Sequence, residues 1–201
     1  ADCGREARDY IVRRGLSAQT VNRFGLGFSP NEWSALKDAM QKQGYTQKEL
    51  LDAGLAVNGK KGGVYDRFRN RLMFPIINHR GDTIGFGGRI LGEGEPKYLN
   101  SPETIVFTKS HVLYGLNFAG PEIRKTGRAV LLEGYMDVIA CHQAGVSYTV
   151  APLGTSLTDE HARLLKRYTQ NVVVLFDPDE AGIKAALRGG LILIERGLFV
   201  K

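Results

Sequence analysis

The stretch NVVVLFDPDEAG (residues 171–182) decides the fold of this chain. Five consecutive apolar residues end here at three carboxylates, Asp177, Asp179 and Glu180. A short apolar run with acidic residues beyond it is typical of a buried β-strand that opens into the first turn of a helix. The sequence therefore predicts a strand over 171–176 and a helix over about 180–196.

The residues before this stretch repeat the same alternation of strand and helix. AVLLE (129–133) and VSYTVA (146–151) are predicted strands, YMDVIACHQA (135–144) is a predicted helix, and Thr158 is a predicted cap for a further helix. Strands and helices that alternate with such short connections indicate a parallel sheet flanked by helices.

The first part of the chain has a different pattern. Helices are predicted over 5–24, over 32–43 with Asn31 as its cap, and from a Thr46 cap to Ala53, and LMFPIIN (72–78) and TIGFGGRI (83–90) form a predicted hairpin. We expect an α/β fold in which a parallel sheet flanked by helices (129–201) follows a basic α+β part (1–128) of short helices and antiparallel strands.

Charge divides the chain at the same place. The net charge is +6, with 20 Lys and Arg against 13 Asp and Glu in residues 1–128, and 7 against 8 in residues 129–201. A basic part beside a slightly acidic one favours a polyanion-binding surface next to a cation site, although unevenly distributed solvated charge gives the same counts.

The acidic residues follow the predicted strands. Glu133 ends one strand and is followed by Gly134, and Asp177 and Asp179 end another, with Pro178 favouring extended backbone between them. In parallel sheets ligands bind beyond the carboxyl ends of the strands. Three carboxylates converging there would suit Mg²⁺, which is shared with substrate phosphates. The alternative is a strand end plus a helix cap, with Glu133 an incidental surface acid.

Two further groups belong to this predicted site. Asp137 lies one helical turn after Glu133 and would support the site from behind the ligands. Gly154, Thr155 and Ser156 offer backbone and hydroxyl donors to a phosphate, or form an ordinary helix cap.

The basic part concentrates its charge in YDRFRNRLMFPI (65–76). An extended backbone would place Arg67, Arg69 and Arg71 on one face, with Phe68, Leu72 and Phe74 on the other. Guanidiniums in a row suit bidentate contacts to phosphates. Three cations outside this stretch extend the same polarity: Arg89, Lys97 and Lys109. A solvated charged strand is the alternative.

Several classes of protein are excluded. Cys3 and Cys141 are too few for a disulfide framework or a four-ligand zinc site, and the four histidines show no metal-binding spacing. There is no apolar run of about 18 residues and no signal region, so we expect no membrane association and a cytoplasmic location.

The motifs EGYMDVIA, PLGTSLT and FDPDEAG, in this order, resemble the Toprim domain of bacterial primases, topoisomerases and nucleases. The upstream YDRFRNRLMFPI, GFGGR, PKYLNSPET and FTKSHVLYG resemble the basic subdomain of bacterial DnaG-type primases. The likeness runs from about RRGLS (13–17) and FGLGFSPNEW (24–33) to the end of the chain.

This resemblance implies a DNA-dependent RNA polymerase that makes replication primers from ribonucleoside triphosphates on single-stranded DNA. It implies Mg²⁺, or Mn²⁺ in its place, held by Glu133, Asp177 and Asp179, with Glu133 as the candidate general base. It also implies template or nucleotide contacts by Arg67, Arg69, Arg71, Arg89, Lys97 and Lys109. The family acts at replication forks and reaches the replicative helicase through a C-terminal domain.

The chain departs from the family pattern in three ways. Pro178 stands where a small residue is common, a second acidic pair is missing, and the zinc-binding and helicase-binding domains are absent. We therefore expect a core fragment, truncated in its Toprim domain, with no zinc, an incomplete metal site and little activity alone. A Toprim-type metal-dependent nuclease and a non-catalytic nucleotide- or DNA-binding module are the alternatives. A topoisomerase would need an attacking Tyr, and none stands in a recognisable context.

Overall fold

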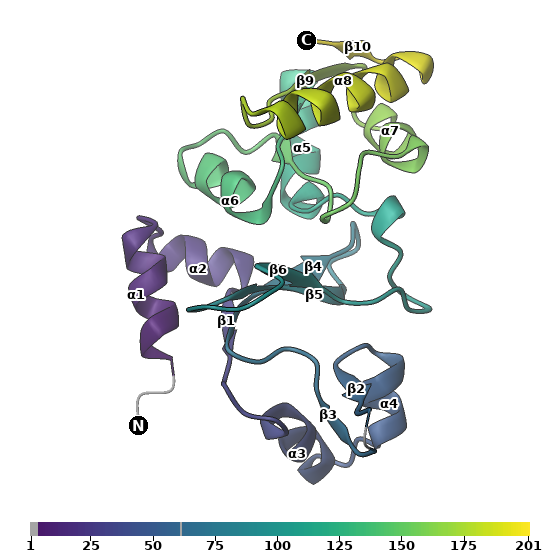
Figure 1. The fold of residues 1–201 in the computed structure, drawn as a ribbon. Helices are drawn as coiled ribbons and strands as arrows, with labels where there is room; N and C mark the ends of the chain where they lie inside the picture. The colour runs from purple at the N-terminus through teal and green to yellow at the C-terminus, as the bar shows by residue number, and fades with distance from the viewer. Residues whose placement is uncertain (1–3, 61) are drawn as a thin grey trace. The chain divides into compact units, whose positions relative to one another are not determined.

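The computed structural model describes residues 4–60 and 62–201 (Figure 1). The chain folds into two compact units. Unit 1 runs to Pro75 and includes residues 84–107, and unit 2 contains residues 76–83 and 108–201. Cys3, which we expect to be a free thiol, lies outside the described residues.

Unit 1 begins with four short helices: α1 (Arg5–Arg13), α2 (Ala18–Phe24), α3 (Ala35–Lys42) and α4 (Gln47–Asp52). The single helix predicted over 5–24 is wrong, because Gly15 adopts a positive φ of 67° and ends α1. Ser17 then caps α2 by accepting a hydrogen bond from the backbone N–H of Thr20. The Thr46 cap of α4 is confirmed and is reinforced by Glu49 in a capping box.

Helix α3 starts three residues later than predicted, and Asn31 does not cap it. Its first backbone N–H groups, those of Leu36 and Lys37, donate to the carboxylate of Asp66 at 2.6 and 2.9 Å. Asp66 is buried and lies some 30 residues further along the chain. A distant carboxylate therefore satisfies the free donors of this helix end.

The predicted hairpin is confirmed within a larger antiparallel sheet. Its strands are β1 (Gly27–Ser29), β4 (Arg71–Ile77), β5 (Thr83–Ile90) and β6 (Tyr98–Asn100), in the order β1-β4-β5-β6. Leu72, Phe74 and Ile76 alternate along β4 and are fully buried. Strands β2 (Ala56–Asn58) and β3 (Val64–Asp66) pair separately as an antiparallel ribbon.

Unit 2 contains the predicted parallel sheet. The 3₁₀ turn η1 (Lys109–His111) and helix α5 (Leu116–Thr126) precede the alternation of strands and helices: β7 (Arg128–Leu131), α6 (Tyr135–Gln143), β8 (Thr149–Val150), α7 (Asp159–Lys166), β9 (Asn171–Val174), α8 (Glu180–Glu195) and β10 (Phe199–Val200). The strand order is β10-β9-β7-β8, and every pair is parallel. Helices α5 to α8 flank the sheet around a core that includes Leu131, Val150 and Leu193 (Figure 1).

The strands of this sheet are shorter than predicted. Strand β8 covers only two residues because Val146 is tied to the end of α6 through a hydrogen bond to the carbonyl of Cys141. Glu133 follows Leu131 by two residues, and Asp177 follows Val174 by three. Backbone bonding continues beyond the strand ends, since the N–H of Leu175 donates to the carbonyl of Leu131. The acidic residues therefore belong to the loops beyond the strands.

Residues 108–128, assigned from sequence to the first part, lie in unit 2. We keep the division at 128 and 129 as a proposal for the boundary between the basic part and the part that contains the parallel sheet.

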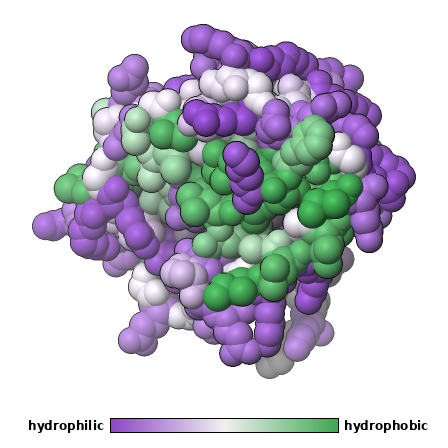
Figure 2. Space-filling model, turned by 90° about the horizontal axis from the view of Figure 1, so that it is seen from above, coloured by the Kyte–Doolittle hydropathy of each residue, from purple (hydrophilic) through white to green (hydrophobic). Residues whose placement is uncertain are grey.

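Helix α8 carries one face of exposed apolar side chains. Ile183, Leu187, Leu191 and Ile194 are each more than half exposed. Figure 2, seen from above, shows a broad apolar area on this side of the molecule. Among the described residues, α8 and the other helices are too short or too polar to cross a membrane.

Two leucines of α8 provide a test of this packing. Leu193 is fully buried and Leu191 is 62% exposed. We expect Leu193→Ala to lower the free energy of unfolding by about 2–5 kcal/mol, because it removes buried methyl groups and leaves a cavity. Leu191→Ala should change it by less than about 0.5 kcal/mol. Urea unfolding of both variants measures the difference, and equal losses would contradict the assigned orientation of α8.

Candidate active site

A cavity of about 270 Å³ lies beyond the strand ends of unit 2. It contains two of the predicted acids, Glu133 and Asp179, and two residues of the predicted phosphate loop, Thr155 and Ser156. Its lining is completed by apolar and small residues and one cation: Pro152, Leu157, Phe176, Ala181, Gly182, Ala185, Arg188 and Gly189. The topology thus brings together the loops that follow β7, β8 and β9.

Each of the two cavity acids holds backbone with one oxygen. Glu133 accepts a 2.7 Å hydrogen bond from the backbone N–H of Asp177 through Oε1. Asp179 is the N-cap of α8, and its Oδ1 accepts a 2.7 Å hydrogen bond from the backbone N–H of Gly182. The predicted alternative, a helix cap, is therefore correct for Asp179 and leaves its second oxygen for another partner.

Gly182 is a site residue that the sequence reasoning missed. A Cβ at this position would overlap the carbonyl oxygen of Asp177 and lie 2.7 Å from Oε1 of Glu133. The first turn of α8 can approach the loop after β9 only because residue 182 has no side chain. The signal was present in the sequence, since this glycine lies three residues after Asp179 inside a helix, where glycine is unfavourable.

The three predicted metal ligands do not converge on one point. The carboxylate of Asp177 is exposed and does not line the cavity. Within residues 4–60 and 62–201, no group of three acidic, histidine or cysteine side chains is placed to hold one metal ion. The expected three-acid cluster is therefore not formed. Glu133 and Asp179 still offer hard oxygen donors in one cavity, and Mg²⁺ commonly uses one or two carboxylates together with water and phosphate.

The loop after β8 contributes Thr155 and Ser156 to the lining of the cavity. Gly154 adopts a positive φ of 66°, and Gly154, Thr155 and Ser156 are all exposed. Two hydroxyls thus stand at a cavity that also holds carboxylates. Arg188 of α8, which the sequence reasoning did not single out, adds the positive charge. Hydroxyls and a guanidinium are the donors that a phosphate group requires.

Asp137 is exposed in the first turn of α6 and is not part of the cavity lining. Its charge, after burial, is a cause of the raised pKa of the Cys141 thiol one turn later. Asp137 therefore makes no contribution to the cavity lining that would support its predicted role behind the metal ligands.

The predicted arginine row in unit 1 is not an extended strand. Strand β3 ends at Asp66 and β4 begins at Arg71, and Asn70 between them has a φ of 50°. Arg67, Arg69 and Arg71 nevertheless line a single cavity of about 460 Å³, together with Trp33, Asn70, Glu93 and Glu95 among others. The cluster is confirmed as a shared lining, although its predicted geometry is wrong.

The three arginines differ in what they can do. Arg71 is buried and donates to the carbonyls of Gly88 and Pro96 at 3.0 and 2.9 Å. Burial, followed by the charges of Arg69 and Arg67, lowers its pKa. Arg67 donates through Nη2 to the carbonyl of Asn100 at 3.0 Å, and burial lowers its pKa as well. The hydrogen bonds of Arg71 therefore stabilise the sheet. The neighbouring charges of Arg69 and Arg67 disfavour its charged form.

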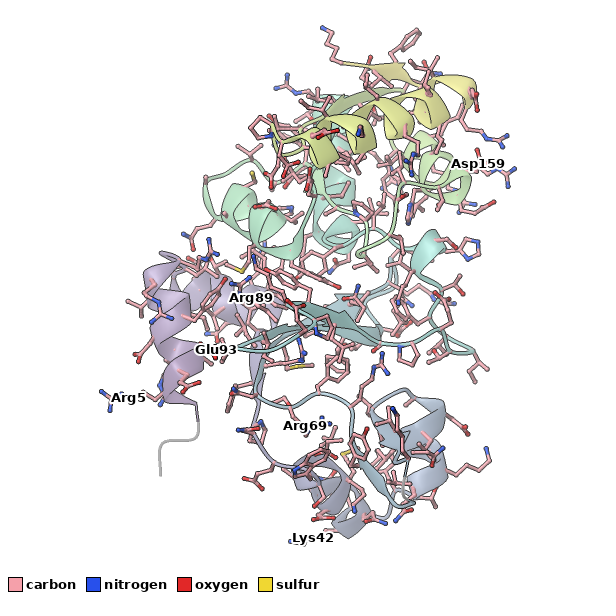
Figure 3. The ribbon with its side chains drawn as sticks, in the orientation of Figure 1. Arg5, Lys42, Arg69, Arg89, Glu93 and Asp159 are labelled. Atoms are coloured by element: carbon pink, nitrogen blue, oxygen red, sulfur yellow. The ribbon has the colours of Figure 1, made fainter. Side chains whose placement is uncertain are left out.

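Arg69 lies against aromatic rings (Figure 3). Its guanidinium carbon is 4.3 Å from the ring centroid of Trp33 and 4.9 Å from that of Tyr65. Trp33 is 66% exposed, an unusual state for so large an apolar side chain. A flat, charged and exposed surface of this kind suits a nucleobase or its phosphate. Trp33 was absent from the predicted site.

The remaining predicted cations have different surroundings. Arg89 lies between the rings of Tyr10 and Tyr98, at 4.8 and 5.3 Å. Lys97 is exposed just before β6. Lys109 begins η1 in unit 2, where its carbonyl oxygen is within hydrogen-bond distance of the His161 ring.

The parallel sheet with acidic residues beyond its strand ends defines the class of protein. A Toprim-like family model matches residues 130–201, which places the second part of the chain among Toprim proteins. The model of the DNA primase catalytic core, N-terminal domain, matches residues 1–120. The chain belongs to the DNA primase family.

Individual relatives agree with this assignment. The DNA primase of Clostridium acetobutylicum is 49% identical over 201 residues, which are all of this chain and 33% of that protein. A DnaG primase catalytic domain solved with single-stranded DNA superimposes with a TM-score of 0.85 at 46% identity, over 94% of this chain and 61% of that one. The zinc-binding and RNA polymerase domains of the Aquifex aeolicus primase superimpose with a TM-score of 0.90 at 38% identity. This match covers 98% of this chain and 48% of that one. The chain spans about a third of the length of the full-length relative.

Gly182 gives a test of the site geometry. We expect Gly182→Ala to destabilise the chain by about 1–3 kcal/mol, because the new methyl group overpacks the contact with Asp177 and Glu133. Gly190→Ala is the matched control in the same helix. An added Cβ there meets its first neighbour at 3.8 Å, so alanine should be neutral or stabilise by up to about 1 kcal/mol. Chemical denaturation distinguishes the two, and a neutral Gly182→Ala would contradict the close approach.

Proposed function

We propose that this chain is part of the RNA polymerase core of a bacterial DNA primase, which synthesises short RNA primers on single-stranded DNA by Mg²⁺-dependent nucleotidyl transfer. The family assignment supports the reaction class. The observation that carries the proposal is the unit 2 cavity, which is lined by two carboxylates, by Arg188 and by the hydroxyl residues Thr155 and Ser156.

The residues of this cavity form two groups, one that would bind a cation and one that would bind a phosphate. Glu133 and Asp179 each use one carboxylate oxygen to accept a backbone N–H, and their other oxygens would hold Mg²⁺ or Mn²⁺. When bound, such a cation neutralises the charge of a triphosphate and lowers the pKa of an attacking hydroxyl. Thr155, Ser156 and Arg188 would donate to the phosphate oxygens, which orients the nucleotide.

Asp177 has a different proposed part. Its backbone N–H holds Glu133, and its exposed carboxylate lies in the same loop as Asp179. We assign it to the metal site as an outer acid that approaches the cation when nucleotide is present. Because three acids do not form one cluster in this chain, we expect nucleotide and DNA binding by the chain alone, with little primer synthesis.

Unit 1 would bind the template or nucleotide phosphates. The half-buried Arg69 and the exposed Trp33 would form this surface, and Arg67 lines the same cavity. Arg89 and Lys97 add charge elsewhere in unit 1, and Lys109 does so in unit 2. Arg71 contributes its charge to the cavity while its hydrogen bonds hold the sheet.

The partners and location follow from the same proposal. The chain would meet ribonucleoside triphosphates and template at replication forks in the bacterial cytoplasm. Contact with the replicative helicase would fall to a further domain of the full-length protein.

Single-stranded DNA binding tests the arginine surface. We expect the logarithm of the affinity to fall linearly with the logarithm of salt concentration, because bound phosphates release counterions. Arg69→Ala and Arg67→Ala/Arg69→Ala should weaken binding and reduce this slope by about 0.7 for each lost phosphate contact. Lys48→Ala is the control, since Lys48 pairs with Asp52 on α4, away from this cavity. Fluorescence anisotropy measures both quantities, and an unchanged double variant would overturn the assignment.

Two isosteric substitutions test the cation site. Glu133→Gln and Asp179→Asn keep an oxygen that can accept the existing backbone hydrogen bonds, and Asn caps helices as well as Asp does. Stability should therefore change little, while each lost negative charge should abolish the Mg²⁺ dependence of triphosphate binding. Calorimetric titration with and without Mg²⁺ gives the result. Arg67→Ala/Arg69→Ala should retain the Mg²⁺ dependence, and Mg²⁺-dependent binding by both isosteric variants would contradict the site.

A further inference from the structure

The backbone of the turn that carries Lys109 is held by the first residues of helix α7. Thr158, the N-cap of α7, donates its hydroxyl to the carbonyl of Ser110 at 2.9 Å. The Nε2 of His161 lies 3.0 Å from the carbonyl of Lys109 and 3.1 Å from that of Val112. Two neighbouring side chains thus bind three carbonyls of residues 109–112, and we refer to Thr158 and His161 as the clamp.

The hydrogen bonds of His161 determine its protonation. Its Nδ1 accepts the backbone N–H of Thr158 at 3.3 Å, so Nδ1 carries no proton. The proton therefore sits on Nε2, where it is shared between the two carbonyls. The ring is fully buried. A proton added at Nδ1 would face the N–H of Thr158 and end this bond, so only the neutral imidazole holds the helix cap and the two carbonyls at the same time.

A neutral histidine at this position does what an ionised Glu, a common capping residue, cannot. Glu or Gln commonly occupies the third position of a capping box, as Glu49 does in α4. An ionised Glu accepts hydrogen bonds only and would repel the carbonyls of Lys109 and Val112. Neutral histidine accepts at one nitrogen and donates at the other. The helix cap and the turn therefore depend on the same ring.

The clamp also lies between two groups that the proposed function uses. Lys109 is on one side, at the start of η1. On the other side, Thr158 directly follows the segment with Thr155, Ser156 and Leu157, which line the unit 2 cavity. The turn of Lys109 is tied to the clamp by hydrogen bonds and residues 155–157 by the chain itself, so a change in the clamp should affect both segments.

We propose that His161 is a positioning residue that fixes Lys109 relative to the phosphate loop 154–156. This inference rests on the proposed function for the part played by Lys109, and on the hydrogen bonds of the clamp for everything else. His161 touches no reacting group and acts through Lys109 and the loop.

Acid should weaken the clamp at its helix-cap side. Burial, above all, lowers the pKa of His161; the hydrogen bonds to the carbonyls of Lys109 and Val112 oppose this shift, and the charge of His111 on η1 adds to it. The other charged groups near it along the chain are Lys109 on η1 and Asp159 and Glu160 in the first turn of α7 (Figure 3 labels Asp159). The unfolded chain takes up this proton near pH 6.5 and the folded chain only at lower pH. The contribution of His161 to stability is therefore complete above pH 6.5 and is lost as the pH falls through the folded pKa.

The test compares five forms of the chain: the parent, Lys109→Ala, His161→Ala, the double variant and His161→Gln. The measurement is the salt dependence of binding to a fluorescein-labelled single-stranded oligodeoxynucleotide at neutral pH. Loss of one phosphate contact reduces the slope by about 0.7. We expect this reduction in Lys109→Ala and again in His161→Ala, with no further reduction in the double variant, since both act on one contact. Gln has both a donor and an acceptor, so His161→Gln should restore the parental slope.

Amide hydrogen exchange reports on the clamp without reference to binding. His161→Ala should speed exchange locally at residues 109–112 and 154–158, while amides of β7 and β9 keep their protection. In the parent the same amides should exchange faster, relative to the intrinsic rate, as the pH falls below 6.5, and His161→Gln should not show this change.

The outcomes separate the inference from the proposed function. A parental slope in His161→Ala together with a reduced slope in Lys109→Ala would overturn the inference and leave the function standing. Additive losses in the double variant, or unchanged local exchange, would also overturn it. If Lys109→Ala binds as the parent does, the role proposed for Lys109 is wrong and so is the positioning of Lys109 by His161. The exchange data then still decide whether the clamp holds the turn and loop.

Discussion

The close approach of helix α8 to the loop after β9 is the constraint on which the unit 2 site depends. Gly182 lies where a side chain would overlap the carbonyl of Asp177. That approach leaves the N–H of Asp177 directed at Glu133 and the N–H of Gly182 directed at Asp179. Two acidic residues from different loops are thereby oriented by backbone donors. The carboxylates are placed before any cation arrives, and the cation need not bring them together.

The same arrangement sets what the site can bind. One oxygen of each cavity acid already has a hydrogen-bonded partner, so the pair presents fewer ligand atoms than a site that encloses a metal completely. A cation held this way keeps positions for water and phosphate, as Mg²⁺ requires. In the proposed function, Arg188 would balance part of the charge of an anion at the same cavity, and the hydroxyls of Thr155 and Ser156 would donate hydrogen bonds to it. The chemistry that fits is the binding of a cation and a polyphosphate together.

Local signals in the sequence predicted much of this fold, and distant contacts account for what they missed. The capping residues Thr46 and Thr158 and the parallel sheet are readable because each depends on a few neighbouring residues. Asp66, at the end of strand β3, caps α3 from some 30 residues away, and no local pattern could reveal this contact. The prediction of an extended strand through the three arginines was wrong for a related reason. Asn70 turns the chain at a position where the alternation of residues alone predicts extended backbone. At the site, residue types were predictable, but which oxygen of Glu133 or Asp179 was already engaged was not.

The helix caps of unit 2 connect these points. Asp179 closes the first turn of α8 and also lines the cavity, while Thr158 and His161 close α7 and also hold the turn of Lys109. A cap has a fixed geometry, because the free N–H groups of a helix end dictate where its acceptor must lie. Side chains that serve both the cap and a neighbouring loop therefore transmit the rigidity of the helix to that loop. Functional groups in short loops beyond the strands need such support, since β8 itself has only two residues. The helices, more than the strands, fix the geometry of this site.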